Sequence, residues 1–134
     1  MSKQSLITVE LKTPNNAEGA AASILAGARD QLGFVPNMYA AMANLPAVLE
    51  HYTASYAAFR ESAGFTPAEQ ETVFLTISHA NGCHYCIAAH SMLADMMSRV
   101  PKDALEALRN GDTPADTRLG ALSEFTRRMT VLRG

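Results

Sequence analysis

Apolar residues three and four positions apart recur along most of this chain, and that spacing constrains its fold more than any other feature. Near the C-terminus they are Leu119, Leu122, Phe125, Met129 and Leu132. Residues at this spacing lie on one face of an α-helix, whereas a half-buried strand needs alternating apolar and polar residues. No stretch after Val9 shows sustained alternation. The sequence therefore predicts an all-α fold.

Capping signals divide this helical pattern into segments. Thr66-Pro67-Ala68-Glu69 combines a capping box with a proline at the first helical position, so we expect a helix from Pro67 to Asn81-Gly82. The next helix is expected to start around Cys83 and to continue through Met96 or Met97. The other expected starts are an N-cap at Asn16, Pro36-Asn37, Asn44-Pro46, Pro101 and an N-cap at Asp116, and the expected ends include Gly33, Gly64 and Asn110-Gly111.

The length of 134 residues fits one domain. We expect an extended arm over residues 1–15, which includes Leu6-Ile7-Thr8-Val9, and one helical domain over residues 16–134. No internal repeat, low-complexity tract or linker interrupts the pattern. The last amphipathic helix has no later helix to cover its apolar face, so we expect either a second subunit there or a sequence that has been cut short.

Composition excludes several classes of protein. A hydrophobic fraction of 48% with 18% charged residues argues against a disordered chain. A net charge of −2 argues against a dedicated nucleic-acid binder. No apolar run approaches the roughly 20 residues of a membrane span, and the first residues contain no apolar segment long enough for a secretory signal. We therefore expect a cytoplasmic protein without a nucleic-acid or membrane partner.

The only two cysteines, Cys83 and Cys86, are three positions apart. A disulfide between them closes a very short loop, and the entropic stabilisation from a disulfide falls as its loop shortens. A reducing compartment would also keep a purely structural pair open. At a helix start, unpaired N–H groups and the positive end of the helix dipole stabilise a thiolate. We therefore interpret the pair as reactive rather than structural.

His90 follows Cys86 by four residues, so on a helix its imidazole can reach that sulfur. It could then take the thiol proton or, as an imidazolium, hold the thiolate. We expect His79 and His84 to be structural or incidental, and His51 carries no signal.

A zinc site is the main alternative for the cysteine pair, with His84 or His90 as further ligands. Structural zinc usually takes four ligands, often with a second, distant cysteine pair, and this chain has no other cysteine. Ile87 follows Cys86, so the CxxCH pattern of c-type haem attachment is absent. No strands flank the motif, as a thioredoxin fold would require. We expect neither a metal nor another cofactor.

Glu71 lies twelve residues before Cys83, among apolar residues. By itself it is consistent with a solvated acid in the first turn of a helix, where the dipole favours negative charge. A turn at Asn81-Gly82 could instead fold it back toward the cysteines. The spacing alone leaves both interpretations open.

One family shares this combination of residues. Glu71, an eleven-residue gap and then Cys83-His84-Tyr85-Cys86-Ile87-Ala88-Ala89-His90 resemble the core of the alkylhydroperoxidase AhpD-like members of the carboxymuconolactone decarboxylase superfamily. Residues 32–37 (LGFVPN) and 80–83 (ANGC) are similar to its peroxidase-related members. The resemblance covers about residues 20–132. It implies an all-α AhpD-like fold, homo-oligomers that are often trimers or hexamers, and an antioxidant thiol peroxidase.

The resemblance also implies a role for each site residue. Cys86 corresponds to the thiol that attacks the peroxide, and Cys83 to the partner that resolves the sulfenic acid as a disulfide. His90 would accept or relay the thiol proton, and Glu71 would hold and polarise His90 through water. An external dithiol would then reduce the disulfide. The position of Cys83 at the helix start favours it as the attacking thiol, whereas the family pattern and the His90 spacing favour Cys86, which we adopt.

Two features depart from the family pattern. Tyr85 stands where the best-characterised members have a histidine, and a phenol is a poor base near neutral pH, so we assign Tyr85 a supporting role only. Peroxidase-related members also usually continue with another pair of helices beyond the position of Gly134.

Two other functions compete with the peroxidase. The first is a redox- or metal-responsive oligomeric interaction protein, in which the cysteine pair changes state without efficient turnover. The second is lactone decarboxylation, which the superfamily's name suggests, although members that perform it generally lack the CxxC pair.

Overall fold

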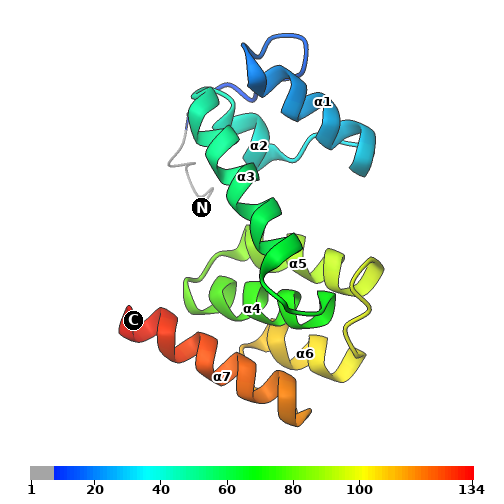
Figure 1. Ribbon diagram of the computed structural model, residues 1–134, viewed down its shortest axis with the longest axis vertical. Coiled ribbons are helices and arrows are strands. Elements are labelled where there is room, and N and C mark those ends of the chain that lie inside the picture. The colour runs from blue at the N-terminus through cyan, green and yellow to red at the C-terminus, as the bar shows by residue number, and fades with distance from the viewer. Residues whose placement is uncertain (1–7) are drawn as a thin grey trace, which may run out of the picture. The chain divides into compact units, whose positions relative to one another are not determined.

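The structure is a computed structural model that describes residues 8–134 of the chain. Within these residues it contains seven helices and no strand (Figure 1), so the all-α prediction is confirmed. The helices are α1 (Ala20–Leu32), α2 (Asn37–Met42), α3 (Pro46–Ser62), α4 (Pro67–Ala80), α5 (His84–Met96), α6 (Lys102–Asn110) and α7 (Thr117–Leu132).

The expected N-terminal arm is described only in part. Leu6 and Ile7 lie outside the described residues, while Thr8 and Val9 belong to neither a helix nor a strand. The contacts divide the chain into two compact units. In the sequence, the first unit ends at Glu61 and the second begins at Ser62, near the end of α3. The sequence suggests a single helical domain over residues 16–134, and its boundaries stay a prediction. Each unit is described here by itself.

The first unit contains α1, α2 and most of α3. Its core joins Ala21 and Leu25 of α1 to Leu49 of α3 and to Ala43, which follows α2. Gly33 ends α1 in the left-handed conformation with φ 80°, as the sequence predicts.

The predicted N-cap at Asn16 is wrong. Helix α1 begins only at Ala20, after Gly19 at φ 55°. The Asn16 side chain instead accepts hydrogen bonds from the backbone N–H of Thr13 at 2.6 Å and from its hydroxyl at 3.0 Å. Asparagine side chains form hydrogen bonds to nearby backbone groups in turns as readily as they cap helices. Here Asn16 stabilises the turn that includes Pro14.

The second unit is organised around α4, which packs against α5, α6 and α7. Figure 1 shows α4 between α5 and α7. The buried core of the unit joins side chains from these helices and from the segment between α5 and α6: Leu75, Ala94, Val100, Ala104, Leu105, Leu108 and Leu119. A polar contact adds to it, because the hydroxyls of Thr76 on α4 and Ser123 on α7 lie 3.1 Å apart.

The helix ends of this unit follow the sequence signals closely. Thr66 and Glu69 form the predicted capping box at the start of α4, with Pro67 in the first turn. The Asp116 side chain caps α7 by accepting from the N–H groups of Arg118 and Leu119 at 3.0 and 2.8 Å. Asn81 and Gly82 separate α4 from α5, so the predicted break there is confirmed.

The predicted apolar face of α7 is buried only at its start. Leu119 is buried in the core, whereas the side chains toward the C-terminal end are exposed, among them Phe125, Met129, Val131 and Leu132. No helix among the described residues has both the length and the apolar character needed to cross a membrane.

Candidate redox site

A helical hairpin made of α4 and α5 carries all the residues that the sequence singles out. Glu71 lies in the second turn of α4, and His90 lies in the middle of α5. Only residues 81–83 connect the two helices, because Asn81 ends α4 and Gly82, at φ 64°, turns the chain into Cys83. The short connection forces the two helices to lie against each other, and it places both cysteines at the end of the hairpin where α4 ends and α5 begins.

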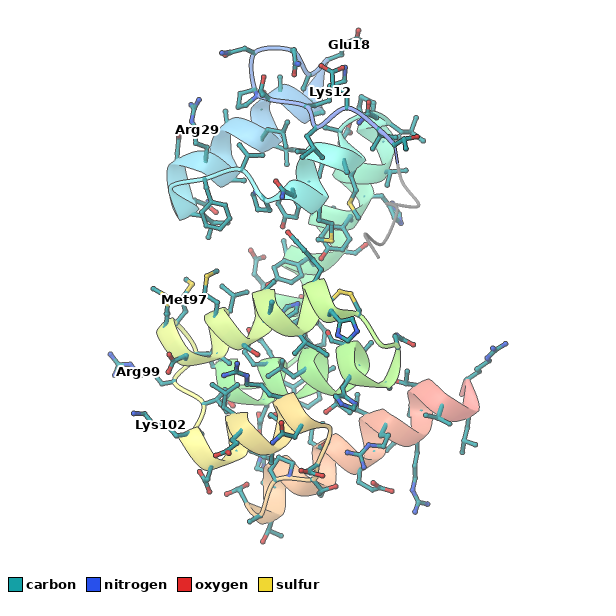
Figure 2. The ribbon with its side chains drawn as sticks, turned by 180° about the vertical axis from the view of Figure 1, so that it is seen from behind. Lys12, Glu18, Arg29, Met97, Arg99 and Lys102 are labelled. Atoms are coloured by element: carbon teal, nitrogen blue, oxygen red, sulfur yellow. A yellow bond between two sulfur atoms is a disulfide. The ribbon has the colours of Figure 1, made fainter. Side chains whose placement is uncertain are left out.

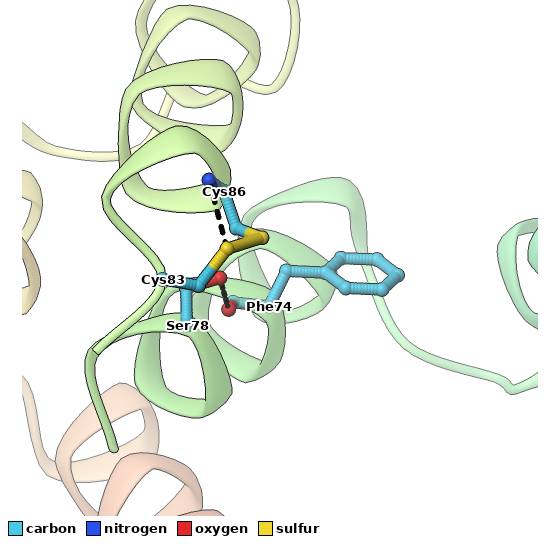
Figure 3. Close-up of a disulfide and its surroundings, with 4 residues drawn as sticks. All are labelled: Phe74, Ser78, Cys83 and Cys86. Carbon is cyan, nitrogen blue, oxygen red and sulfur yellow. Dashed lines mark hydrogen bonds between the residues drawn. A yellow bond between two sulfur atoms is a disulfide. The ribbon is translucent and has the colours of Figure 1, made fainter. Parts of the chain in front are cut away.

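Cys83 and Cys86 are joined by a disulfide, with their Cα atoms 5.3 Å apart (Figures 2 and 3). Cys83 is the N-cap of α5, and its sulfur accepts a hydrogen bond from the backbone N–H of Cys86 at 3.3 Å. The backbone N–H of Cys83 donates to the carbonyl of Ser78 at 2.9 Å. The Ser78 hydroxyl in turn donates to the carbonyl of Phe74 at 2.6 Å (Figure 3). These contacts fix the first turn of α5 on the end of α4.

Glu71 and His90 form a direct pair across the hairpin. The imidazole Nδ1 of His90 lies 2.9 Å from Oε2 of Glu71, with no water between them, unlike the arrangement implied by the family resemblance. The Glu71 side chain is 0% exposed and that of His90 is 13% exposed. The alternative of a solvated first-turn acid is therefore wrong for Glu71. A carboxylate on Glu71 can only accept a hydrogen bond, and in that pairing Nδ1 donates to it while Nε2 is left for proton transfer.

Ser98 contacts the other oxygen of the Glu71 carboxylate. Its hydroxyl donates to Oε1 at 3.4 Å, a long hydrogen bond. Ser98 follows the end of α5, next to Arg99, which Figure 2 labels in the segment after this helix. Arg99 adopts a left-handed conformation with φ 50°. Sequence reasoning missed Ser98, because nothing in the local pattern shows that the chain turns back toward Glu71 after α5.

Phe74 stacks on the imidazole of His90. The ring centroids are 4.5 Å apart, and the two planes are within 8° of parallel. Phe74 is three residues from Glu71, so both project from the same face of α4. In the sequence, Phe74 is one of the apolar residues that follow Glu71. The i, i+3 spacing from Glu71 was the one signal that could have pointed to it.

The other candidate residues on this hairpin and in the first unit are exposed. Tyr85 is 45% exposed in the first turn of α5, and its supporting role stays a prediction. His84 is exposed beside it, and His51 is exposed in the first unit. Among the described residues, no group of three or more His, Cys, Asp or Glu side chains is placed to hold a metal ion.

His79 faces a different part of the second unit. It lines a cavity of about 290 Å³ together with residues of α4, α6, α7 and the segment after α6: Thr76, Ala80, Leu108, Gly111, Asp112, Ser123, Arg127 and Val131. At 100° per residue, Thr76 and Ala80 project from the side of α4 opposite Glu71, and the cavity lining includes neither Glu71 nor His90. The cavity therefore does not belong to the cysteine site.

A second acid on α4 has a structural role. Glu69 is buried, and its carboxylate accepts from the Arg118 guanidinium and, at 2.8 Å, from the backbone N–H of Thr66. These hydrogen bonds, that from Arg118 foremost, hold the pKa of the Glu69 carboxyl below its ordinary value. Glu69 thus joins the start of α4 to the start of α7, while Glu71, two residues later, turns toward His90.

Comparison with known proteins agrees with the resemblance in the sequence. The family model described as the carboxymuconolactone decarboxylase family matches residues 45–122, which include Glu71, both cysteines and His90. A search of curated proteins finds no match. The matched residues make up more than half of the chain and contain the whole α4–α5 hairpin. The chain belongs to the carboxymuconolactone decarboxylase family, in the AhpD-like superfamily.

Proposed function

We propose that this chain is a thiol-dependent peroxidase that cycles the Cys83–Cys86 disulfide. The observation that carries the proposal is the disulfide at the start of α5, on the same hairpin as the buried Glu71–His90 pair. The family includes alkylhydroperoxidases and decarboxylases, so an enzymatic role is consistent with its membership. A thiol pair that forms a disulfide favours electron transfer to a peroxide over decarboxylation, which takes no electrons from thiols.

The first chemical step breaks the O–O bond of a hydroperoxide. His90 Nε2 accepts the proton of the Cys86 thiol, since His90 lies one helical turn beyond Cys86. The thiolate attacks one peroxide oxygen, forming a sulfenic acid, and the other oxygen leaves as an alkoxide that takes the proton from His90. Glu71 accepts a hydrogen bond from Nδ1–H throughout and stabilises the imidazolium between the two transfers.

The second and third steps complete the cycle. The Cys83 thiol condenses with the sulfenic acid of Cys86, which forms the disulfide and releases water. An external dithiol then reduces the disulfide by thiol–disulfide exchange, returns both thiols and leaves as its own disulfide. The hydrogen bond from the Cys86 N–H to Cys83 Sγ, together with the helix N-terminus, favours negative charge on Cys83 when it departs as a thiolate in this exchange.

The decisive experiment follows thiol loss in the reduced protein while a hydroperoxide is added in stoichiometric steps. We expect wild type to lose both thiols per peroxide, and Cys83→Ser to lose one and hold a trappable sulfenic acid on Cys86. Cys86→Ser is expected to lose dithiol-dependent peroxide turnover, because no attacking thiol remains. tert-Butyl hydroperoxide and hydrogen peroxide are the two probes, and mass spectrometry locates the oxidised sulfur.

Unchanged turnover in Cys86→Ser would contradict the proposal. A Cys83→Ser variant that stays fully reduced while Cys86→Ser forms a sulfenic acid would reverse the roles of the two cysteines. A wild-type protein whose oligomer size changes with oxidation, without peroxide consumption, would favour the redox-responsive interaction protein. Decarboxylation of a lactone by a variant lacking both cysteines would favour the lactone decarboxylase.

A further inference from the structure

We infer that Phe74 is a positioning residue for the imidazole of His90, an assignment that rests on the proposed peroxidase. Two side chains from one face of α4 hold this ring. Glu71 contacts its Nδ1 at 2.9 Å, and Phe74 lies flat against its face, with centroids 4.5 Å apart and planes 8° from parallel. Together they determine where Nε2 points.

The hydrogen bond to Glu71 is insufficient by itself to fix the ring. An imidazole turns about two side-chain torsions, and the second, between a tetrahedral and a planar carbon, has a broad energy minimum. One hydrogen bond anchors the position of Nδ1, but the plane of the ring can still tilt about that contact. A parallel aromatic ring at van der Waals distance opposes the tilt. The direction of Nε2 is then set by both contacts together.

The direction of Nε2 matters because proton transfer depends on geometry before it depends on acidity. Cys86 lies one turn before His90 on α5, so a modest tilt of the ring changes the distance and angle between Nε2 and the sulfur. Displacement of a reacting group by about 1 Å can cost large factors in rate. Phe74 therefore acts on the reaction through His90 and needs no contact with the peroxide.

A purely apolar role explains the position of Phe74 less well. The fully buried apolar side chain of this part of α4 is Leu75, whereas Phe74 is only partly buried. Burial alone requires no particular ring orientation, and leucine would satisfy it. Parallel alignment with the imidazole is a feature that only a flat side chain provides. Replacement by leucine therefore separates apolar packing from ring alignment.

The test compares Phe74→Leu, Phe74→Tyr and the control Phe125→Leu. Phe125 lies on α7 and is 63% exposed, so its replacement makes the same chemical change away from His90. The first measurement is the rate at which the reduced proteins lose thiols to tert-butyl hydroperoxide. The second is the two-bond ¹H–¹⁵N correlation of the histidine rings, with the His90 signals assigned from a His90→Asn spectrum. The NMR arm requires no peroxide reaction, so it separates failure of this inference from failure of the proposed function.

We expect Phe74→Leu to react about two- to tenfold more slowly than wild type, the range that loss of one aromatic pair allows. Its His90 ring signals should broaden, because the ring samples several tilts while Nδ1 stays in contact with Glu71. Phe74→Tyr should restore both properties, and Phe125→Leu should match wild type. A wild-type rate in Phe74→Leu, His90 ring signals as sharp as those of wild type, or failure of Phe74→Tyr to retain both properties would each overturn the inference. If wild type itself consumes no peroxide, the proposed function fails, and the NMR comparison alone decides whether Phe74 orients the ring.

Discussion

Ser91 is next to His90 in the sequence but has no comparable partner. It is 8% exposed, and its hydroxyl oxygen is buried without a hydrogen-bond partner among the described residues. Ser123 provides a contrast, because it is fully buried and its hydroxyl lies 3.1 Å from that of Thr76. A buried hydroxyl without a partner lowers stability, whereas a paired one contributes to it. Burial of a serine alone is therefore insufficient to predict whether its hydroxyl raises or lowers the stability of the fold.

Ser91→Ala should raise the free energy of unfolding by about 1 kcal/mol, since it removes a buried polar group that forms no hydrogen bond. Ser123→Ala, the matched control, should lower it by about 1 kcal/mol, since it removes a buried hydrogen bond. Urea denaturation of the oxidised protein measures both. Equal shifts in the two variants would contradict this prediction.

Some residues of the site can be predicted from the sequence, and others cannot. The cysteines and His90 follow from spacing along one helix, and Glu71 follows from the family pattern. Phe74 and Ser98 do not, because their roles depend on how α5 lies against α4 and on a left-handed residue, Arg99, after α5. Local spacing describes one helix at a time, whereas these contacts are made between elements.

At the scale of the element, helix ends are predictable where the capping side chain has no competing hydrogen-bond partner nearby. Thr66 with Glu69, and Asp116, each cap the helix that the sequence predicts. Asn16 has a competing partner in Thr13, and the helix starts later than expected. The exposed apolar side chains of α7 agree with the expectation that no later helix covers this face, whereas periodicity does not identify what would cover it.

Gly111 ends α6, and both its backbone angle and the space beside it restrict which residue can stand there. It adopts φ 80°, and a Cβ atom there would lie 2.2 Å from the His79 ring. Gly33 ends α1 with the same φ of 80°, but nothing lies within 4 Å of an added Cβ. The two glycines therefore share the backbone requirement and differ in the space beside them.

Gly33→Ala should lower the free energy of unfolding by about 1–2 kcal/mol, the cost of a left-handed alanine. Gly111→Ala should lose slightly more, because the His79 ring has to move aside, and this exposed, flexible side chain can do so at small cost. Urea denaturation measures both losses. In a His79→Ala background the extra loss should disappear, and its persistence there would show that His79 is not the obstacle.

At the scale of the whole molecule, the family match over residues 45–122 includes parts of both compact units. The predicted trimer or hexamer, the external dithiol and the cytoplasmic location stay predictions. The exposed apolar side chains of α7 agree with an assembly but do not identify its partner. Within the second unit, the ion pair of Glu69 and Arg118 joins α4 to α7 through two residues that are 49 positions apart in the chain.

That ion pair predicts how stability depends on pH. Because the pKa of folded Glu69 is lowered, its contribution is complete above the ordinary value of about 4.5 and is lost as the pH falls through the folded value. Glu69→Gln keeps a capping side chain but removes the charge. Wild type should therefore be more stable than Glu69→Gln at neutral pH, and the difference should shrink below about pH 4.5.

Urea denaturation at a series of pH values measures this difference. Glu124→Gln is the control, since Glu124 pairs at 2.8 Å with Arg128 on the same helix and links no separate elements. Its effect should be smaller at neutral pH. A difference between wild type and Glu69→Gln that stays constant from neutral pH to pH 3 would exclude the ion pair as its source.

The residues of the redox site lie close together in the sequence, and this affects the order in which their contacts form during folding. Glu71 and His90 are 19 residues apart, and the cysteines and Phe74 lie between them. Closing a short loop costs little chain entropy, and contacts that are local in sequence form early. The pair of Thr76 and Ser123, by contrast, must wait until residues 47 positions apart meet. We therefore expect the reacting groups to come together as soon as this hairpin forms, while α7 is still unfolded.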